Sequence, residues 1–168
     1  CAPFVKTLTT KFGKKEMSLV GLLIASAAYF FLFFLKNIDA MTFIYISFIG
    51  FIGFGLFNTV IWAFVTDVID YQEYLTDLRE DGTVYSVYSF ARKVGQALAG
   101  GIGGFAIAAI GYDASREVQT NEALNGIHTL ATLVPAVVYL GIFLILLFFY
   151  PLNKTRLAKM QEELEARR

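Results

Sequence analysis

The sequence predicts an all-helical membrane protein with four transmembrane helices. Hydrophobic residues make up 57% of the chain and charged residues 17%, whereas roughly a quarter of the residues are charged in soluble domains. Four apolar stretches are each long enough to cross a hydrocarbon core of about 30 Å. Lysine and arginine also gather on one side of these stretches, as they do in inner-membrane proteins.

The expected elements follow in order along the chain. Residues 1–16 are polar and basic and are predicted to form a cytoplasmic loop. Residues 17–151 form the transmembrane part, with spans at about 17–35, 41–66, 84–111 and 127–150, the last with a kink at Pro135. Residues 152–168 form a cytoplasmic tail. Because the chain begins at Cys1 and shows no signal peptide, we expect it to be a piece of a longer protein.

The distribution of basic residues predicts the orientation. One side of the four spans collects ten lysines and arginines, and the other side has only Lys36 and Arg116. The ten are Lys6, Lys11, Lys14, Lys15, Arg79, Lys154, Arg156, Lys159, Arg167 and Arg168. The positive-inside rule then places both termini and the loop 67–82 in the cytoplasm.

The third span carries two cations well inside its apolar sequence. Lys93 lies about 15 Å along a helix from the polar start at residues 81–82, where a basic side chain costs roughly 2.5–3.5 kcal/mol. Such residues normally face a protein partner or a water-filled cavity. The predicted solute-binding residues are Lys93, Ser89, Tyr88, Arg92 and Gln96. A structural role for Lys93, and snorkelling of Arg92 to the headgroups, are the alternatives.

Small residues repeat every four positions along the same span. Such spacing lets helix backbones approach closely in lipid. The predicted packing residues are Gly95, Ala99, Gly100, Gly103 and Gly104.

The acidic stretch after the second span predicts either a solvated helix end or a salt-bridge lock. Asp67, Asp70 and Glu73 recur at helical spacing, and Arg79 follows them. In the second interpretation these groups form ion pairs at a cytoplasmic gate that open and close with conformation. Charge runs are usually solvated, so the first interpretation stays open.

The remaining polar residues suggest supporting roles. Asn58 is expected to hydrogen-bond between helices, and Trp62 is expected to anchor the second span at the interface. His128 has no carboxylate or cysteine cluster beside it, and Cys1 is the single cysteine, so no metal site, cofactor or catalytic residue is predicted. The tail repeats Leu157, Met160 and Leu164 at helical spacing, which predicts either an amphipathic helix at the membrane surface or a frayed tail.

One block carries a family resemblance: DVIDYQEYLTDLREDGTVYSVYSFARKVGQALAGGIGG, residues 67–104. It resembles the tenth-helix end, cytoplasmic loop and eleventh helix of the glycoside–pentoside–hexuronide:cation symporters of the major facilitator superfamily, which include melibiose permease and the glucuronide carriers. The run around Asp67, Asp70 and Glu73, the later Arg79, and the Tyr-Ser pattern ending at Lys93 carry the likeness. More loosely, the whole chain resembles helices nine to twelve of twelve.

The resemblance implies what the complete protein does. It implies symport of a sugar, glycoside or hexuronide with Na⁺, Li⁺ or H⁺ by alternating access in the bacterial inner membrane. It places the positions of Lys93, Ser89, Tyr88 and Arg92 at the solute, and those of Asp67, Asp70 and Arg79 in a charged network between the two halves. Arg92 and Tyr88 depart from melibiose permease, which points to an anionic or differently shaped glycoside such as a hexuronide or xyloside.

The resemblance also implies that part of the transporter lies outside this chain. The coupling cation is expected to bind mainly in an N-terminal half of the same transporter, which would be a partner of this chain along with lipid and substrate; no nucleic-acid partner is expected. The alternative is a small four-span structural or assembly protein without transport activity. An enzyme is not expected.

Overall fold

The computed structural model describes residues 9, 11–36 and 38–167 of the chain. It contains five helices within these residues: α2 (Lys14–Phe34), α3 (Ala40–Thr76), α4 (Asp81–Ala109), α5 (Asn121–Phe149) and α6 (Lys154–Arg167). The expected all-helical fold is confirmed by these elements. Most of the expected loop 1–16 lies outside the described residues, but α2 already begins at Lys14, before the expected start of the first span.

Local signals in the sequence explain where the helices begin and end. The side chain of Asp39 accepts a hydrogen bond from the Thr42 amide at 3.0 Å and so caps the start of α3. Thr120 caps α5 in the same way through the Ala123 amide at 3.2 Å. At its far end α3 stops at Asp77, whose φ of 55° is left-handed and cannot continue the helix.

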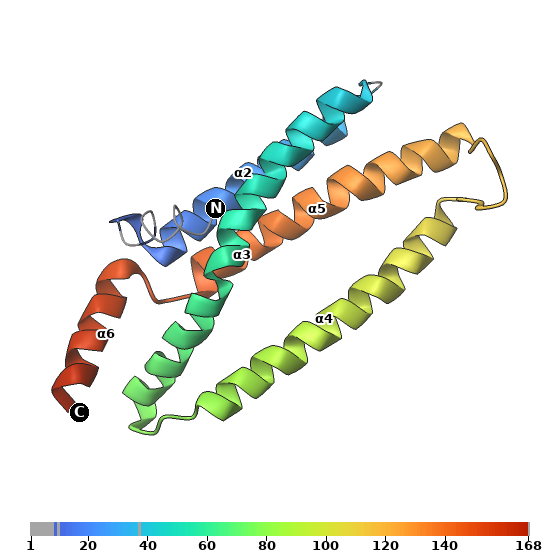
Figure 1. Cartoon of the computed structure of the whole chain (residues 1–168). Coiled ribbons are helices and arrows are strands. Elements are labelled where there is room, and N and C mark those ends of the chain that lie inside the picture. Colours follow the sequence, from blue (N-terminus) through green and yellow to red (C-terminus); the bar gives the residue numbers. More distant parts are fainter. Residues whose placement is uncertain (1–8, 10, 37, 168) are drawn as a thin grey trace.

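Helices α2, α3 and α5 pack together, and α4 runs separately from them along most of its length (Figure 1). The core cluster contains Leu22 from α2, Val60 and Phe64 from α3, and Leu146 from α5. The backbones of α2 and α3 come very close at Gly21 and Gly53, because a Cβ added to Gly53 would lie 2.5 Å from the Gly21 carbonyl oxygen. Small residues therefore allow this crossing.

Among the described residues, three helices are long and apolar enough to cross a membrane: α2, α3 and α5. Their outward faces carry large exposed hydrophobic side chains, as lipid-facing helices do. Helix α4 has 29 residues and is long enough to cross a membrane, but its sequence is less apolar than the sequences of the other three helices. The two basic residues and the many glycines of α4 lower its hydropathy, so the expected count of four spans stays a prediction.

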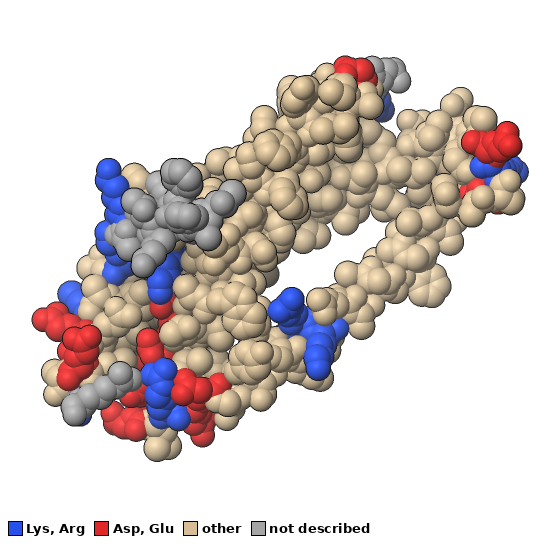
Figure 2. Space-filling view, in the orientation of Figure 1, with Lys and Arg blue, Asp and Glu red and all other residues tan. Residues whose placement is uncertain are grey.

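Charged side chains gather at one end of the structure, around α6 and the end of α3 next to it (Figure 2). A second, smaller group lies at the opposite end, near the loops that join α2 to α3 and α4 to α5. Between the two ends, basic side chains interrupt the apolar surface partway along α4. This distribution separates two candidate functional regions, one on α4 and one at the charged end.

Candidate functional site

The predicted solute-binding residues lie on the middle part of α4. Arg92, Lys93 and Gln96 are exposed, and Tyr88 and Ser89 are partly buried. No residue of α4 is buried, and neither Arg92 nor Lys93 has a hydrogen-bond or ion-pair partner in the described part of the chain. Two unpaired cations thus lie roughly 15–25 Å from either end of a helix of this length.

A polar hollow of about 400 Å³ lies between α3 and α4 next to these residues. Arg92 and Tyr88 line it from α4, and Asn58 and Trp62 line it from α3. The ring of Trp62 contacts Tyr88 with centroids 5.4 Å apart and stacks on Tyr85 at 6.2 Å. Lys93, Ser89 and Gln96 are not among the residues that line this hollow.

The chemistry of the hollow suits a hydroxylated solute with an acidic group. A guanidinium group binds a carboxylate or sulfonate through paired N–H donors, a carboxamide can both donate and accept hydrogen bonds to hydroxyls, and an aromatic face can cover the apolar face of a sugar ring. Sequence reasoning did not connect Asn58 and Trp62 with the site. Their spacing of four residues places them on one face of α3, but no signal in the sequence shows that this face lies next to Tyr88 and Arg92.

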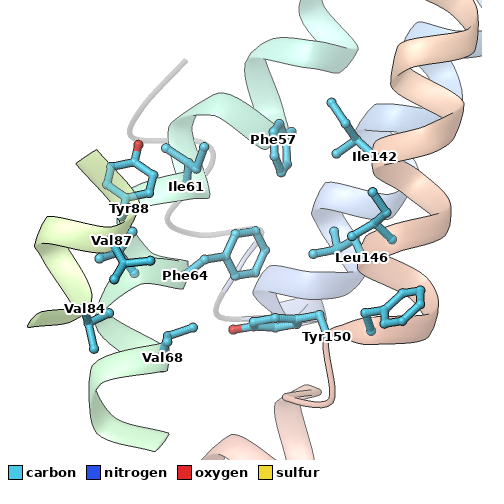
Figure 3. Close-up of a pocket in the computed structure, with 13 residues that line it drawn as sticks. Phe57, Ile61, Phe64, Val68, Val84, Val87, Tyr88, Ile142, Leu146 and Tyr150 are labelled. Atoms are coloured by element: carbon cyan, nitrogen blue, oxygen red, sulfur yellow. The ribbon is translucent and has the colours of Figure 1, made fainter. Parts of the chain in front are cut away.

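A second hollow of about 470 Å³ lies between α3, α4 and α5. Figure 3 shows its labelled lining side chains, among them Val87 from α4, Phe64 from α3 and Leu146 from α5. Almost all of the lining is apolar, with the Tyr88 and Tyr150 hydroxyls as exceptions. A sugar would lose hydrogen bonds to water here without replacement, so the polar hollow between α3 and α4 is the better candidate for a solute site.

At the charged end, Asp67 joins three helices. It is 2% exposed, and its carboxylate accepts a hydrogen bond from the Lys14 ammonium of α2 at 2.6 Å. The hydroxyl of Tyr150, which directly follows α5, makes a longer contact of 3.5 Å to the other carboxylate oxygen. The acidic residue predicted for the gate is therefore paired inside this bundle.

Lys15 ties α2 to the end of α5. Its ammonium donates to the carbonyl oxygens of Leu147 at 3.1 Å and Tyr150 at 2.6 Å. A cation at the last carbonyls of a helix satisfies groups that lack a partner within the helix and interacts favourably with the helix dipole. Lys14 and Lys15 were expected in a polar loop, and no pattern in the sequence revealed their partners.

The other predicted gate residues form a separate ion-pair group. Arg79 contacts Asp70 at 2.9 Å, Glu73 at 2.8 Å and Asp81 at 3.1 Å. Hydrogen bonds to Glu73, then Asp70 and Asp81, raise the pKa of Arg79 above its ordinary value. The structure thus brings Asp70, Glu73 and Arg79 together and joins Asp67 to a different partner. Whether these pairs open during function stays a prediction.

The small-residue stripe of α4 is exposed. Ala99 is exposed, and a Cβ added to Gly95, Gly100, Gly103 or Gly104 would meet nothing within 4 Å in the described part of the protein. Their predicted role in helix packing stays a prediction. The close glycine contact that the structure does contain, between Gly21 and Gly53, was not singled out in the sequence.

Comparison with known proteins places the chain in a family. Residues 1–154 match the model of the MFS/sugar transport protein family. The chain belongs to this family, which agrees with the resemblance seen in its sequence.

The relatives are longer than this chain. It is 36% identical over 167 residues to the glucuronide carrier protein homolog of Escherichia coli (strain K12), covering 99% of this chain and 36% of the relative. It is 35% identical over 162 residues to a putative sulfoquinovose importer of the same organism, covering 96% and 34%. A putative glycoside/cation symporter of that strain is 38% identical over 112 residues, covering 65% and 24%. The chain thus spans about a third of the length of the first two.

Proposed function

We propose that this chain is part of the C-terminal half of a cation-coupled sugar transporter, that α2, α3, α4 and α5 are helices nine to twelve, and that the transported solute is an acidic sugar or glycoside. The observation that carries the proposal is the pair of unpaired cations on α4, beside a polar hollow between α3 and α4. The family match supports it, and so do the two relatives described as a glucuronide carrier protein homolog and a putative sulfoquinovose importer, since both sugars carry an acid group.

The energetics favour a hydrated solute site around these cations. A lysine or arginine facing hydrocarbon costs several kcal/mol, and the described helices offer Lys93 no counter-ion. Water and an anionic solute between two halves of a transporter would remove this cost. Arg92 would bind the acid group, Lys93 would add positive charge and hydrogen bonds, and Tyr88, Ser89 and Gln96 would shape the wall.

The other roles follow from this assignment. The remainder of the transporter would cover α4, with Gly95, Ala99, Gly100, Gly103 and Gly104 at the contact, and would hold the Na⁺, Li⁺ or H⁺ site. The charged end would face the cytoplasm with residues 1–16 and 152–168, and the transmembrane part would be 17–151. The inner gate would contain Asp70, Glu73 and Arg79. Asp67 would join this group only after giving up its ion pair with Lys14. The protein would be a transporter of the bacterial inner membrane and not an enzyme.

Uptake by the full-length protein tests the proposal. Vesicles containing the wild type should accumulate a labelled uronic acid or sulfonated sugar when a Na⁺ or H⁺ gradient is imposed. Lys93→Ala should reduce uptake at least about tenfold, because it removes a charge contact worth more than 1.4 kcal/mol. Lys36→Ala is the matched control, because Lys36 is also an exposed lysine but lies between α2 and α3.

Arg92→Gln tests the acidic solute separately. It should weaken uptake of acidic sugars more than uptake of their neutral counterparts, because only the former lose an ion pair. Normal uptake by both the Lys93→Ala and the Arg92→Gln proteins would contradict the assignment of the site.

A further inference from the structure

Helix α6 is attached to the end of α3. Its Met160 and Leu164 are buried together with Leu152, and they pack against tyrosines of α3. The Tyr74 hydroxyl donates to Glu163 at 2.9 Å, and Arg167 contacts Asp77 at 3.0 Å. Figure 1 shows α6 beside the end of α3. The tail is therefore a docked amphipathic helix, and the alternative of a frayed tail is wrong for residues 154–167.

A hollow of about 170 Å³ lies between the two helices. Its apolar lining comes from Leu152 and Met160, which are 4% exposed each. Arg156 and Lys159, three residues apart and hence on one face of α6, supply the positive charge. Tyr71, Tyr74 and Glu163 complete the lining. The carboxylate of Glu163 accepts a hydrogen bond from the Tyr74 hydroxyl and forms no ion pair with either cation.

These two cations differ from most of their neighbours at the charged end, which already have oxygen partners. The paired neighbours are Lys14 with Asp67, Lys15 with two carbonyls, Lys154 with the Lys11 carbonyl, Arg79 with its three carboxylates, and Arg167 with Asp77. In the described part of the chain the side chains of Arg156 and Lys159 have no oxygen partner. Arg156 lies over the ring of Tyr71, 5.9 Å from its centroid. A guanidinium beside an aromatic ring can still direct its N–H donors to an anion.

The expected end of the second span would place the hollow near the outer edge of the lipid headgroup layer. On α3 the last residue of the expected span is Thr66, and Tyr71 follows about 7.5 Å further along the helix. The headgroup layer extends about 5–7 Å beyond each side of the hydrocarbon core. The end of α5 also presents Phe148 and Phe149, which are 75% and 80% exposed, to the surroundings. An acyl chain and a headgroup would thus both find suitable surfaces here.

We propose that Arg156 and Lys159, with Tyr71 beside them, bind the phosphate group of an anionic phospholipid and so fix α6 to the membrane surface. The phosphate would accept hydrogen bonds from the N–H donors of Arg156 and from the Lys159 ammonium. Glu163 also lines the hollow, and its carboxylate accepts from the Tyr74 hydroxyl. Basic segments next to a membrane span are attracted to anionic lipid in this way. The inference does not depend on the transported solute or on the role of Lys93.

Lipid retention by the purified full-length protein tests this proposal. The protein is mixed in detergent with equal amounts of phosphatidylglycerol and phosphatidylcholine, and the bound lipid is counted by native mass spectrometry. Wild type should retain phosphatidylglycerol preferentially. Arg156→Gln combined with Lys159→Gln should reduce this preference about ten- to thirtyfold, as expected for two basic groups near an anionic surface. Arg156→Lys combined with Lys159→Arg keeps both charges and should preserve most of it.

Two controls separate the outcomes. Lys36→Gln combined with Arg116→Gln removes the same charge at the opposite end and should leave the preference unchanged. Retention of phosphatidylglycerol by the Arg156→Gln, Lys159→Gln protein equal to that of wild type would overturn the proposal. Competition by millimolar inorganic phosphate that removes the lipid completely would overturn the lipid as the source of the phosphate.

Discussion

Replacing Asp67 with asparagine should loosen the junction of α2, α3 and α5. Asp67 is 2% exposed and contacts Lys14 at 2.6 Å. The Lys14 side chain remains 32% exposed, so water can partly solvate its ammonium after the carboxylate is lost. Removing one partner of a fully buried pair costs roughly 3–5 kcal/mol, and an exposed pair contributes about 0–1 kcal/mol. We therefore expect Asp67→Asn to lower the free energy of unfolding by about 2 kcal/mol, between these limits.

A double-mutant cycle identifies the contact as the cause. The free energy of unfolding is measured in mixed micelles for the full-length wild type, Asp67→Asn, Lys14→Met and the double variant. The two single changes should not add, because each removes the same pair, and the coupling energy should be about 1–2 kcal/mol. Asp70→Asn is the comparison, since its partner Arg79 is 39% exposed, and it should cost less than about 1 kcal/mol. If the effects of Asp67→Asn and Lys14→Met were additive, the contact between these two residues would not stabilise the junction of α2, α3 and α5.

Three other changes test separate parts of the structure. Gly53→Ala should destabilise the α2–α3 crossing, because its Cβ would lie 2.5 Å from a backbone oxygen of Gly21; unchanged stability in the same unfolding assay would contradict this contact. Leu164→Asp should release α6, since it places a charge in a buried position, and trypsin should then cleave α6 at least several times faster than in the Ala158→Asp control. The hydrogen bonds from Thr42 lower the pKa of Asp39. The Asp39 cap of α3 is therefore fully formed above the ordinary pKa of aspartate, and it is lost as the pH falls through the lowered pKa of Asp39. The Thr42 amide NMR shift should follow this titration in wild type and not in Asp39→Ala.

Much of the helical framework follows from local sequence patterns. Uncharged stretches predicted α2, α3 and α5 to within a few residues at most ends. The spacing of carboxylates predicted that the second helix continues past Thr66, and α3 reaches Thr76. The repeat of Leu157, Met160 and Leu164 predicted an amphipathic helix at the membrane surface; the structure contains this helix and packs its apolar face against α3. These signals are local, because helix periodicity reflects which face is apolar.

The partners of the polar residues could not be predicted, because they depend on contacts between distant segments. Lys14 and Asp67 are 53 residues apart, and Lys15 reaches carbonyls more than 130 residues away. A charge pattern on one helix says nothing about which other helix will lie next to it. The same limit applies to Trp62, whose place in the lining of the polar hollow beside Arg92 depends on the contact between α3 and α4; its role as an interface anchor stays a prediction.

The most direct test asks whether position 93 meets water and solute in the complete transporter. Lys93→Cys is introduced into a cysteine-free background, in which Cys1 is also replaced, and the rate of reaction with a charged, water-soluble thiol reagent is measured with and without an acidic sugar. We expect the cysteine to react with the reagent, and to react more slowly when the sugar is present. If a cysteine at position 93 does not react under any condition while one at position 36 reacts rapidly, position 93 faces lipid or a dry site and is not part of a hydrated solute site.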